Sequence, residues 1–347
     1  MPNPSKHDHP FFTACRLEAV PYTPVWLMRQ AGRYMEEYRR LRAEYGFLEL
    51  CKRPDLAAEI TITPVERLKV DAAILFADIL LILEPLEVGL EYSTGDGPVI
   101  HRPVRSGKDV DALKEFDPEN ELSFVYEAVR KSRKALDRRV PLIGFAGAPF
   151  TLASYLIEGS GSRNYIHAKK LYYTAPESWH CLMQRLSQLI TRYLNCQIAA
   201  GVQAVQLFDS WAGCLTPGDY EQFVLPYTRS VIAGLTPGVP VINFSTGTAG
   251  LLKHIRAAGG DVIGLDWRVN LDEGWATVGH DVAVQGNLDP VALFAAPKEI
   301  RRRVADVLDR AGGRPGHIFN LGHGVRPETP VDHVIAMVEA VHELSAR

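Results

Sequence analysis

The chain has 347 residues, of which 46% are hydrophobic and 23% are charged, and its formal net charge is −3. This composition is typical of a globular protein; it excludes a disordered chain and gives no bulk basic charge for binding nucleic acid. The five cysteines form no Cys-x-x-Cys pair, which favours free thiols in a cytoplasmic protein, and no unbroken apolar run has the length of a membrane span.

Short apolar runs bounded by turn residues recur along the chain and predict buried parallel strands. There are eight of them, at residues 25–28, 73–76, 142–145, 204–208, 241–244, 262–265, 282–285 and 317–321. Between them, Thr216-Pro217 and Thr329-Pro330 predict the starts of helices that continue to about residues 235 and 344, and residues 247–258 and 297–310 predict two more helices.

The alternation of strands and helices predicts an α/β fold, a single (β/α)₈ TIM barrel with extra helices in its long early units. An open doubly wound sheet is the alternative, because strands five to seven recur about every 20 residues, which is short for a full crossover. Residues 84–105, rich in glycine, predict a small inserted β-hairpin. No linker divides the chain, so we expect a loose N-terminal tail over residues 1–10 and one barrel domain over residues 11–347.

In such a barrel the chemistry gathers where the strands end. The polar residues that follow predicted strands are Arg29 and Arg33, Asp78, Tyr155, Ser210 and His323. Arg29 and Arg33 are four residues apart, so a helix would present both on one face, and Arg42 could share that side. Residues 26–53 carry seven cations and four anions, a local balance of +3. Either this segment binds an anionic substrate, or it is a solvated helix face with salt bridges.

The other candidates also have two interpretations. Asp78 lies within an apolar run, where a carboxylate is either functional or paired with an arginine. Tyr155 is a site residue or an ordinary buried tyrosine. Two glycines flank His323 and would let a ligand approach the backbone, although a turn histidine is the alternative. Ser210 is outside any G-x-S-x-G motif, which favours a hydrogen-bonding role over a nucleophile.

Other chemistries lack their motifs. The sequence has no nucleotide-binding glycine fingerprint, no histidines and cysteines at zinc spacing, and no lysine at the end of a predicted strand. We therefore expect neither a metal nor a cofactor.

Several segments resemble the uroporphyrinogen decarboxylase family. The two longest are residues 24–33 (PVWLMRQAGR) and 144–159 (GFAGAPFTLASYLIEG). Residues 208–213 (FDSWAG), 225–227 (LPY) and 320–330 (NLGHGVRPETP) are similar to further blocks of that family. The resemblance extends from about residue 16 to the last predicted helix and departs from the family at none of these motifs.

The resemblance implies a cofactor-free homodimeric barrel enzyme of haem biosynthesis. Its reaction converts the four acetates of uroporphyrinogen III to methyl groups, giving coproporphyrinogen III and four CO₂. By motif, Arg29, Arg33 and Arg42 resemble the residues that bind substrate carboxylates, and Asp78 the acid that faces the pyrrole N–H groups. Tyr155, Ser210 and His323 resemble the remaining polar contacts. The general acid stays open among Arg29, Tyr155 and His323.

Two other functions are consistent with a barrel of this kind. Cobamide-dependent methyltransferases share the barrel but carry a zinc site with a His-x-Cys pair, which this sequence lacks. A non-catalytic tetrapyrrole carrier would need the arginines but not Asp78, Tyr155 and His323 together.

Overall fold

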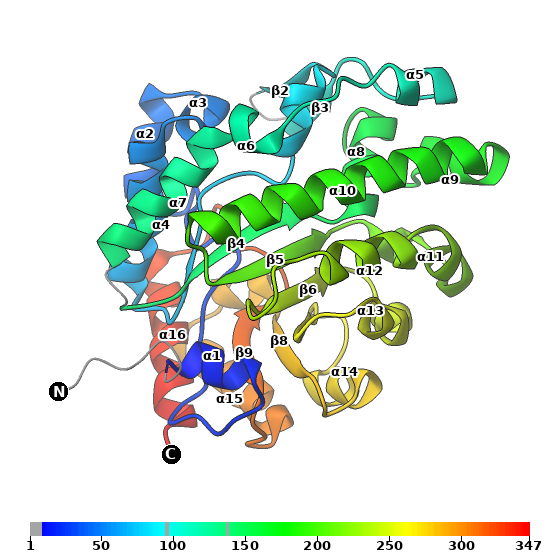
Figure 1. Ribbon diagram of the computed structural model, residues 1–347. Helices are drawn as coiled ribbons and strands as arrows, with labels where there is room; N and C mark the ends of the chain where they lie inside the picture. Colours follow the sequence, from blue (N-terminus) through cyan, green and yellow to red (C-terminus); the bar gives the residue numbers. More distant parts are fainter. Residues whose placement is uncertain (1–8, 94–96, 137–138) are drawn as a thin grey trace.

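The computed structural model describes residues 9–93, 97–136 and 139–347. Seven parallel strands form one curled sheet in the order β1-β4-β5-β6-β7-β8-β9, with helices packed around it (Figure 1). These strands are β1 (Ala73–Ile74), β4 (Leu142–Gly147), β5 (Ala204–Asp209), β6 (Val241–Ser245), β7 (Val262–Gly264), β8 (Ala283–Leu288) and β9 (His317–Leu321). Each pairs with the next, as expected when apolar runs are buried on both faces.

Residues 24–28 close the sheet between β9 and β1. The Phe319 N–H donates to the Pro24 carbonyl at 2.8 Å, and the Asp71 N–H donates to the Val25 carbonyl at 2.7 Å. The chain therefore returns on itself as the predicted barrel, not as an open sheet. The predicted first strand lies in its expected place, but it forms only one bridge, between Val25 and Phe319.

Side chains explain why this segment is not a regular strand. Pro24 has no N–H to donate. The Val25 N–H donates to the Asp71 carboxylate at 2.8 Å, and the Met28 N–H donates to the Asn320 side chain at 3.2 Å. Backbone groups that a ladder would pair are thus satisfied by side chains.

Helices occupy most of the connections. They are α1 (Pro10–Cys15), α2 (Glu36–Glu44), α3 (Phe47–Cys51), α4 (Pro54–Leu68), η1 (Leu81–Leu86), α5 (Gly107–Asp111), α6 (Pro118–Glu121), α7 (Ser123–Leu136), α8 (Pro149–Glu158), α9 (Ile166–Thr174), α10 (Pro176–Ala200), η2 (Ala212–Cys214), α11 (Pro217–Phe223), α12 (Leu225–Ala233), η3 (Ala249–Leu251), α13 (Leu252–Ala258), α14 (Leu271–Val278), η4 (Pro290–Phe294), α15 (Pro297–Ala311) and α16 (Val331–Ser345). The α13 and α14 helices are short, which accounts for the close spacing of the strands they connect.

Two helix predictions need correction. The segment after Thr216 forms α11 and α12 instead of one helix, because the chain leaves helical geometry at Val224. Thr216 does cap α11, accepting the Asp219 N–H at 3.1 Å. Thr329 does not cap α16: Pro330 is the cap residue, and the buried Thr329 hydroxyl has no hydrogen-bond partner among the described residues.

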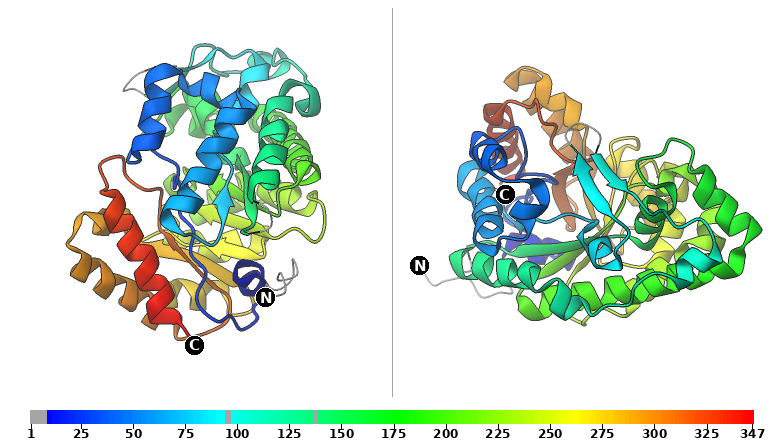
Figure 2. Two further views of the ribbon diagram at one scale, coloured as in Figure 1. Left: turned by 90° about the vertical axis from the view of Figure 1, so that its left-hand side faces the viewer. Right: turned by 90° about the horizontal axis from the view of Figure 1, so that it is seen from above.

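The predicted hairpin is present as β2 (Leu90–Ser93) and β3 (Gly97–Ile100), which pair antiparallel. Its turn, residues 94–96, lies outside the described residues. The Ile100 N–H donates to the Gly159 carbonyl at 2.7 Å, which ties the hairpin to the end of α8. Figures 1 and 2 show the hairpin at the same end of the molecule as α2 and α3, with α1 and the C-terminal residues at the opposite end.

Most of the predicted N-terminal tail, residues 1–8, also lies outside the described ranges, and Pro10 already belongs to α1. The division into a tail and one barrel domain stays a prediction. All five cysteines are free thiols. Within the described ranges, no helix combines the length and the apolar composition needed to cross a membrane.

The barrel seam depends on Asp71, which is buried. Its carboxylate accepts hydrogen bonds from the Val25 N–H at 2.8 Å, the Tyr22 hydroxyl at 3.0 Å and His342 Nε2 at 2.8 Å. It therefore connects the closing segment to the C-terminal helix. Asn at this position would turn an amide N–H₂ towards at least one of these donors.

We expect Asp71→Asn to lower the free energy of unfolding by about 2–3 kcal/mol, since buried donors lose their acceptor. Denaturant titration at constant m-value measures the loss. Asp281→Asn is the control: Asp281 is largely exposed and pairs only with Arg256, so its loss is expected to be below about 0.5 kcal/mol. Equal losses for the two variants would show that Asp71 does not hold the seam.

Candidate active site

Most of the predicted site residues lie at the end of the barrel where the strands have their carboxyl ends, which we call the mouth. Asp78 follows β1, Tyr155 lies on α8 after β4, Ser210 follows β5 and His323 follows β9. Arg29 follows the closing segment. The charge of Arg29 acts on Asp78, Tyr155 and His323, and the charge of Asp78 acts on Tyr155. The structure thus brings Arg29, Asp78, Tyr155 and His323 together.

Asp78 is half-buried and held by two donors. Its Oδ1 accepts the Leu80 N–H at 2.8 Å and the Tyr92 hydroxyl. Burial raises the pKa of this carboxyl, while the Tyr92 and Leu80 hydrogen bonds and the Arg29 charge oppose that rise. Asp78 forms no ion pair within the described residues, so it is not the arginine-paired structural acid of the alternative interpretation. Its charge is fixed in place and poorly solvated.

Tyr92 is a site residue that the sequence did not reveal. It lies on the hairpin strand β2, fourteen positions after Asp78. Its ring packs against Phe47, with the centroids 4.8 Å apart. Nothing in the local sequence connects a hairpin tyrosine with a strand-end acid, so only the folded chain shows this pair.

Arg29 lies in a turn with a left-handed φ of 59°. Arg29 is an exposed residue, and its stem lies against Gly324, where a Cβ would sit 2.5 Å from Arg29 Cδ. Gly324 thus makes room for the Arg29 stem, and the approach of a ligand to the backbone around His323 stays a prediction. The expectation that Arg29 and Arg33 share a helix face is wrong, because residues 29–33 form turns and α2 begins only at Glu36.

Arg33 and Arg42 are less closely tied to the group. Arg33 is exposed, and Arg42 donates to the Tyr45 carbonyl at 2.5 Å. The Arg42 guanidinium lies 6.0 Å from the centroid of the Phe47 ring. Within the described residues, neither arginine makes a hydrogen bond or ion pair with Arg29, Asp78, Tyr155 or His323.

Tyr155 and Ser210 offer hydroxyl groups at the mouth. The Tyr155 ring packs edge-on against Trp211, 5.8 Å between centroids. Burial and the Asp78 charge raise the pKa of Tyr155 to about 12, so its hydroxyl remains a proton donor at neutral pH. Ser210 is half-buried, its carbonyl accepts the Thr246 hydroxyl at 2.7 Å, and its own hydroxyl makes no hydrogen bond in the described part of the chain.

His323 is a neutral imidazole at neutral pH. Burial, and then the charges of Arg29, Arg326 and Arg268, lower its pKa to about 4. Its Nδ1 accepts the Gly324 N–H at 2.8 Å. The proton of the neutral ring is therefore on Nε2, where it can be donated to an anionic ligand.

A second carboxyl was also missed, although it lies in a motif quoted from the sequence. Asp209 ends β5 beside Ser210 and is only 2% exposed. Its Oδ1 accepts the Thr151 hydroxyl at 2.7 Å, whereas its Oδ2 has no partner among the described residues. Burial raises the pKa of this carboxyl to about 7. The position of Asp209 next to Ser210, directly after a predicted strand, is the feature of the sequence that could have indicated it.

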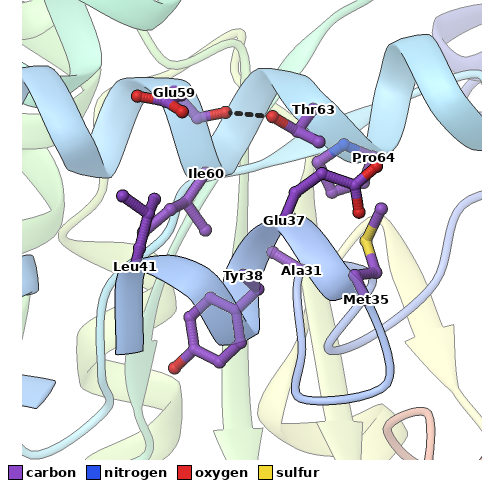
Figure 3. A pocket seen from close by; sticks show the side chains of 9 residues that line it. All are labelled: Ala31, Met35, Glu37, Tyr38, Leu41, Glu59, Ile60, Thr63 and Pro64. Carbon is purple, nitrogen blue, oxygen red and sulfur yellow. Dashed lines mark hydrogen bonds between the residues drawn. The ribbon is translucent and has the colours of Figure 1, made fainter. Parts of the chain in front are cut away.

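Outside the mouth, a hollow lies between α2 and α4 (Figure 3). Its volume is about 10 Å³, room for about one water molecule, and its lining includes neither Arg29 nor Asp78. In the described ranges, no group of three or more His, Cys, Asp and Glu side chains is placed to hold a metal ion.

A closed parallel barrel whose mouth gathers a cation, a fixed carboxyl and protonated donors is typical of an enzyme active site. The model of the family described as uroporphyrinogen decarboxylase matches residues 6–344. The chain is 57% identical over 337 residues to uroporphyrinogen decarboxylase of Carboxydothermus hydrogenoformans, covering 97% of this chain and 96% of the relative. It is 56% identical over 342 residues to that of Roseiflexus sp., covering 97% and 98%. The chain therefore belongs to the uroporphyrinogen decarboxylase family.

Solved structures support the fold. A methyltransferase from Methanosarcina mazei superposes with a TM-score of 0.81 at 18% identity, covering 97% of this chain and 98% of that one. A B12-independent methionine synthase from Shewanella sp. gives a TM-score of 0.55 at 13% identity, covering 86% and 90%. At these identities the likeness concerns the barrel alone.

Proposed function

We propose that this protein decarboxylates uroporphyrinogen III, replacing its four acetate carboxyls by hydrogen to give coproporphyrinogen III and four CO₂. Membership of the family supports this function, and the observation that carries the mechanism is Asp78, fixed by the Tyr92 hydroxyl and the Leu80 N–H at a mouth shared with Arg29. We also propose that the protein acts in the cytoplasm, as a homodimer, in haem biosynthesis.

The pyrrole ring of the substrate is the electron sink. A proton added to a ring carbon makes the pyrrole a cation conjugated to the acetate. The bond between the acetate CH₂ and its carboxylate then breaks, CO₂ leaves, and the electron pair neutralises the ring. A proton added to the resulting methylene carbon and loss of the ring proton give the methyl group, so each CO₂ is replaced by one hydrogen.

Asp78 stabilises the cation in this scheme. A carboxylate that faces the pyrrole N–H groups would become more strongly bound as the ring gains positive charge. Because burial leaves the carboxylate poorly solvated, its attraction to a nearby cation is stronger than in water. The two donors to Oδ1 hold it in position before the reaction starts.

The remaining residues bind and orient. Arg29, Arg33 and Arg42 would hold peripheral carboxylates, and the Tyr155 hydroxyl, Ser210 hydroxyl and His323 Nε2–H would donate hydrogen bonds. The Tyr155 hydroxyl keeps its proton throughout the neutral range, while the His323 imidazole is neutral. Substrate carboxylates beside His323 would raise its pKa, which keeps it a candidate general acid in the complex.

Anaerobic incubation with uroporphyrinogen III tests the function directly. We expect coproporphyrinogen III and four equivalents of CO₂ without added metal or cofactor. Absence of this product with folded protein would overturn the proposal. Light scattering of the same sample tests the homodimer, and a monomer mass would remove that part.

The contact between Gly324 and Arg29 gives a separate prediction. Gly324→Ala places a methyl group against the Arg29 stem, so the guanidinium must move, and we expect kcat/KM to fall by about tenfold. Gly250→Ala is the control, because a Cβ there meets no atom within 4 Å. Unchanged kinetics for Gly324→Ala would show that the position of Arg29 is not set by this contact.

A further inference from the structure

The loop after β7 presents an arginine that the sequence did not single out. Arg268 follows Asp266 and Trp267, and its guanidinium carbon lies 3.9 Å from the centroid of the Trp267 ring. Its side chain is 49% exposed, so it combines a packed stem with an accessible charged end. Stacking on an indole face favours a guanidinium and limits its motion.

Hydrogen bonds to Asp266 hold this loop in position. The Asp266 carboxylate is buried and accepts three hydrogen bonds: from the Gly247 N–H at 2.6 Å, the Arg268 N–H at 3.0 Å and Arg268 Nη1 at 2.5 Å. Gly322 packs directly on the Trp267 backbone, where a Cβ would lie 2.3 Å from its nitrogen. The loop after β7 is thus joined to the loops after β6 and β9, and Arg268 is held in one place.

The position of Arg268 relates it to the site. The Trp267 and His323 rings pack in a T-shaped arrangement, with their centroids 6.2 Å apart. Arg268, Arg326 and Arg29 come from three different loops, and all three lie near enough to His323 for their charges to act on it. Asp266 is the carboxylate that acts on His323 in the opposite sense. This side of the mouth therefore has an excess of positive charge.

We propose that Arg268, held on Trp267 by Asp266, binds a peripheral carboxylate of the substrate on the His323 side of the mouth. This inference rests on the proposed function, which supplies a substrate with eight carboxylates. Arg268 would add a guanidinium from the loop after β7 to Arg29 and Arg33, which follow the closing segment.

The guanidinium has donors to spare for this role. Asp266 takes Nη1, whereas Nε and Nη2 of Arg268 make no hydrogen bond with any described residue. A guanidinium fork presents two parallel N–H groups, which match the two oxygens of a carboxylate. The group that Arg268 would bind is a carboxylate, which belongs either to an acetate that is lost or to a propionate that is retained.

Steady-state kinetics under anaerobic conditions test the proposal with Arg268→Gln, Arg268→Lys and a control. We expect Arg268→Gln to raise KM for uroporphyrinogen III by about five- to tenfold, with kcat within about twofold of the unchanged enzyme. Arg268→Lys should recover part of the loss, because the charge remains but the fork does not. Raising the salt concentration should increase KM less in Arg268→Gln than in the wild-type enzyme.

Arg303→Gln is the matched control. Arg303 on the outer helix α15 is 48% exposed and pairs with Glu299 at 2.9 Å, so it resembles Arg268 in exposure and pairing but lies on a different element. We expect its KM to be unchanged. An unchanged KM for Arg268→Gln, or an equal rise for Arg303→Gln, would overturn the proposal.

Two further experiments are needed. One distinguishes an acetate from a propionate as the carboxylate bound by Arg268, and the other distinguishes failure of this inference from failure of the proposed function. With coproporphyrinogen III, whose four carboxylates are all propionates, the loss of affinity in Arg268→Gln, measured by fluorescence quenching, disappears if Arg268 binds an acetate and persists if it binds a propionate. Quenching of tryptophan fluorescence by uroporphyrinogen III measures binding without turnover. Weaker binding by Arg268→Gln in a protein that does not decarboxylate would leave this inference standing and remove the proposed function.

Discussion

Replacing Asp78 with asparagine is expected to lower kcat for uroporphyrinogen III by about 10²–10³-fold while changing KM little. The amide keeps the shape of the carboxylate and can still accept from Leu80 or Tyr92, but it carries no charge. If Asp78 stabilises a pyrrole cation that forms only during the reaction, the loss falls on the transition state more than on the bound substrate. Anaerobic kinetics measured across a range of substrate concentrations separate the two effects.

Asp289→Asn is a closely matched control for this variant. Asp289 is also half-buried, also follows a barrel strand, and its Oδ1 also accepts the N–H two residues later, that of Val291, at 2.9 Å. We expect its kinetics to be unchanged. Tyr92→Phe should lower kcat less than Asp78→Asn does, because it removes one hydrogen-bond donor and leaves the charge of the Asp78 carboxylate. Near-normal kcat in folded Asp78→Asn would remove the electrostatic role of this residue.

The strands were predictable because the barrel buries them on both faces, and such strands are short apolar runs in the sequence. The closing segment shows where this reasoning stops. Residues 25–28 have the pattern of a strand, but the Asp71 and Asn320 side chains accept N–H groups that a neighbouring strand would otherwise take. Those partners are 46 and 292 residues away, and no local pattern indicates them.

The site was predictable where a residue follows a strand directly. Asp78, Ser210 and His323 were placed at the mouth by that rule, and the structure agrees. The rule says nothing of Tyr92, which reaches Asp78 from an inserted hairpin, or of Arg268, whose neighbour Trp267 holds it. The helix expected for Arg29 and Arg33 fails because Arg29 adopts a left-handed φ, which interrupts a helix. Long-range packing on Gly324 determines where Arg29 lies.

Asp209 makes the stability of the protein dependent on pH. Its ordinary pKa of 3.8 rises to about 7 on folding, mainly because burial penalises the charged form. Between these values the folded chain holds a proton that the unfolded chain has released, so stability falls as the pH rises through this window and the cost is fully present above about pH 7. At pH 8 this difference in pKa between the folded and the unfolded chain lowers the free energy of unfolding by about 4 kcal/mol. The titratable groups near it, Tyr165, Tyr220 and Cys214, stay neutral there because burial raises their pKa values.

We therefore expect Asp209→Asn to be more stable than the unchanged protein at pH 8, and its advantage to shrink by about 2–3 kcal/mol on going down to pH 5. The asparagine oxygen can still accept the Thr151 hydroxyl, so at low pH the two side chains differ little. Comparing the two proteins at each pH by denaturant titration cancels the opposite contribution of His317 and His323, whose lowered pKa values make stability fall with falling pH below about 6.5. Thr151→Val removes a bond that favours the Asp209 carboxylate, and should extend the window to higher pH. A stability difference between Asp209→Asn and the unchanged protein that stays constant from pH 5 to pH 8 would show that Asp209 ionises normally, and that its unpartnered oxygen reaches solvent or a donor.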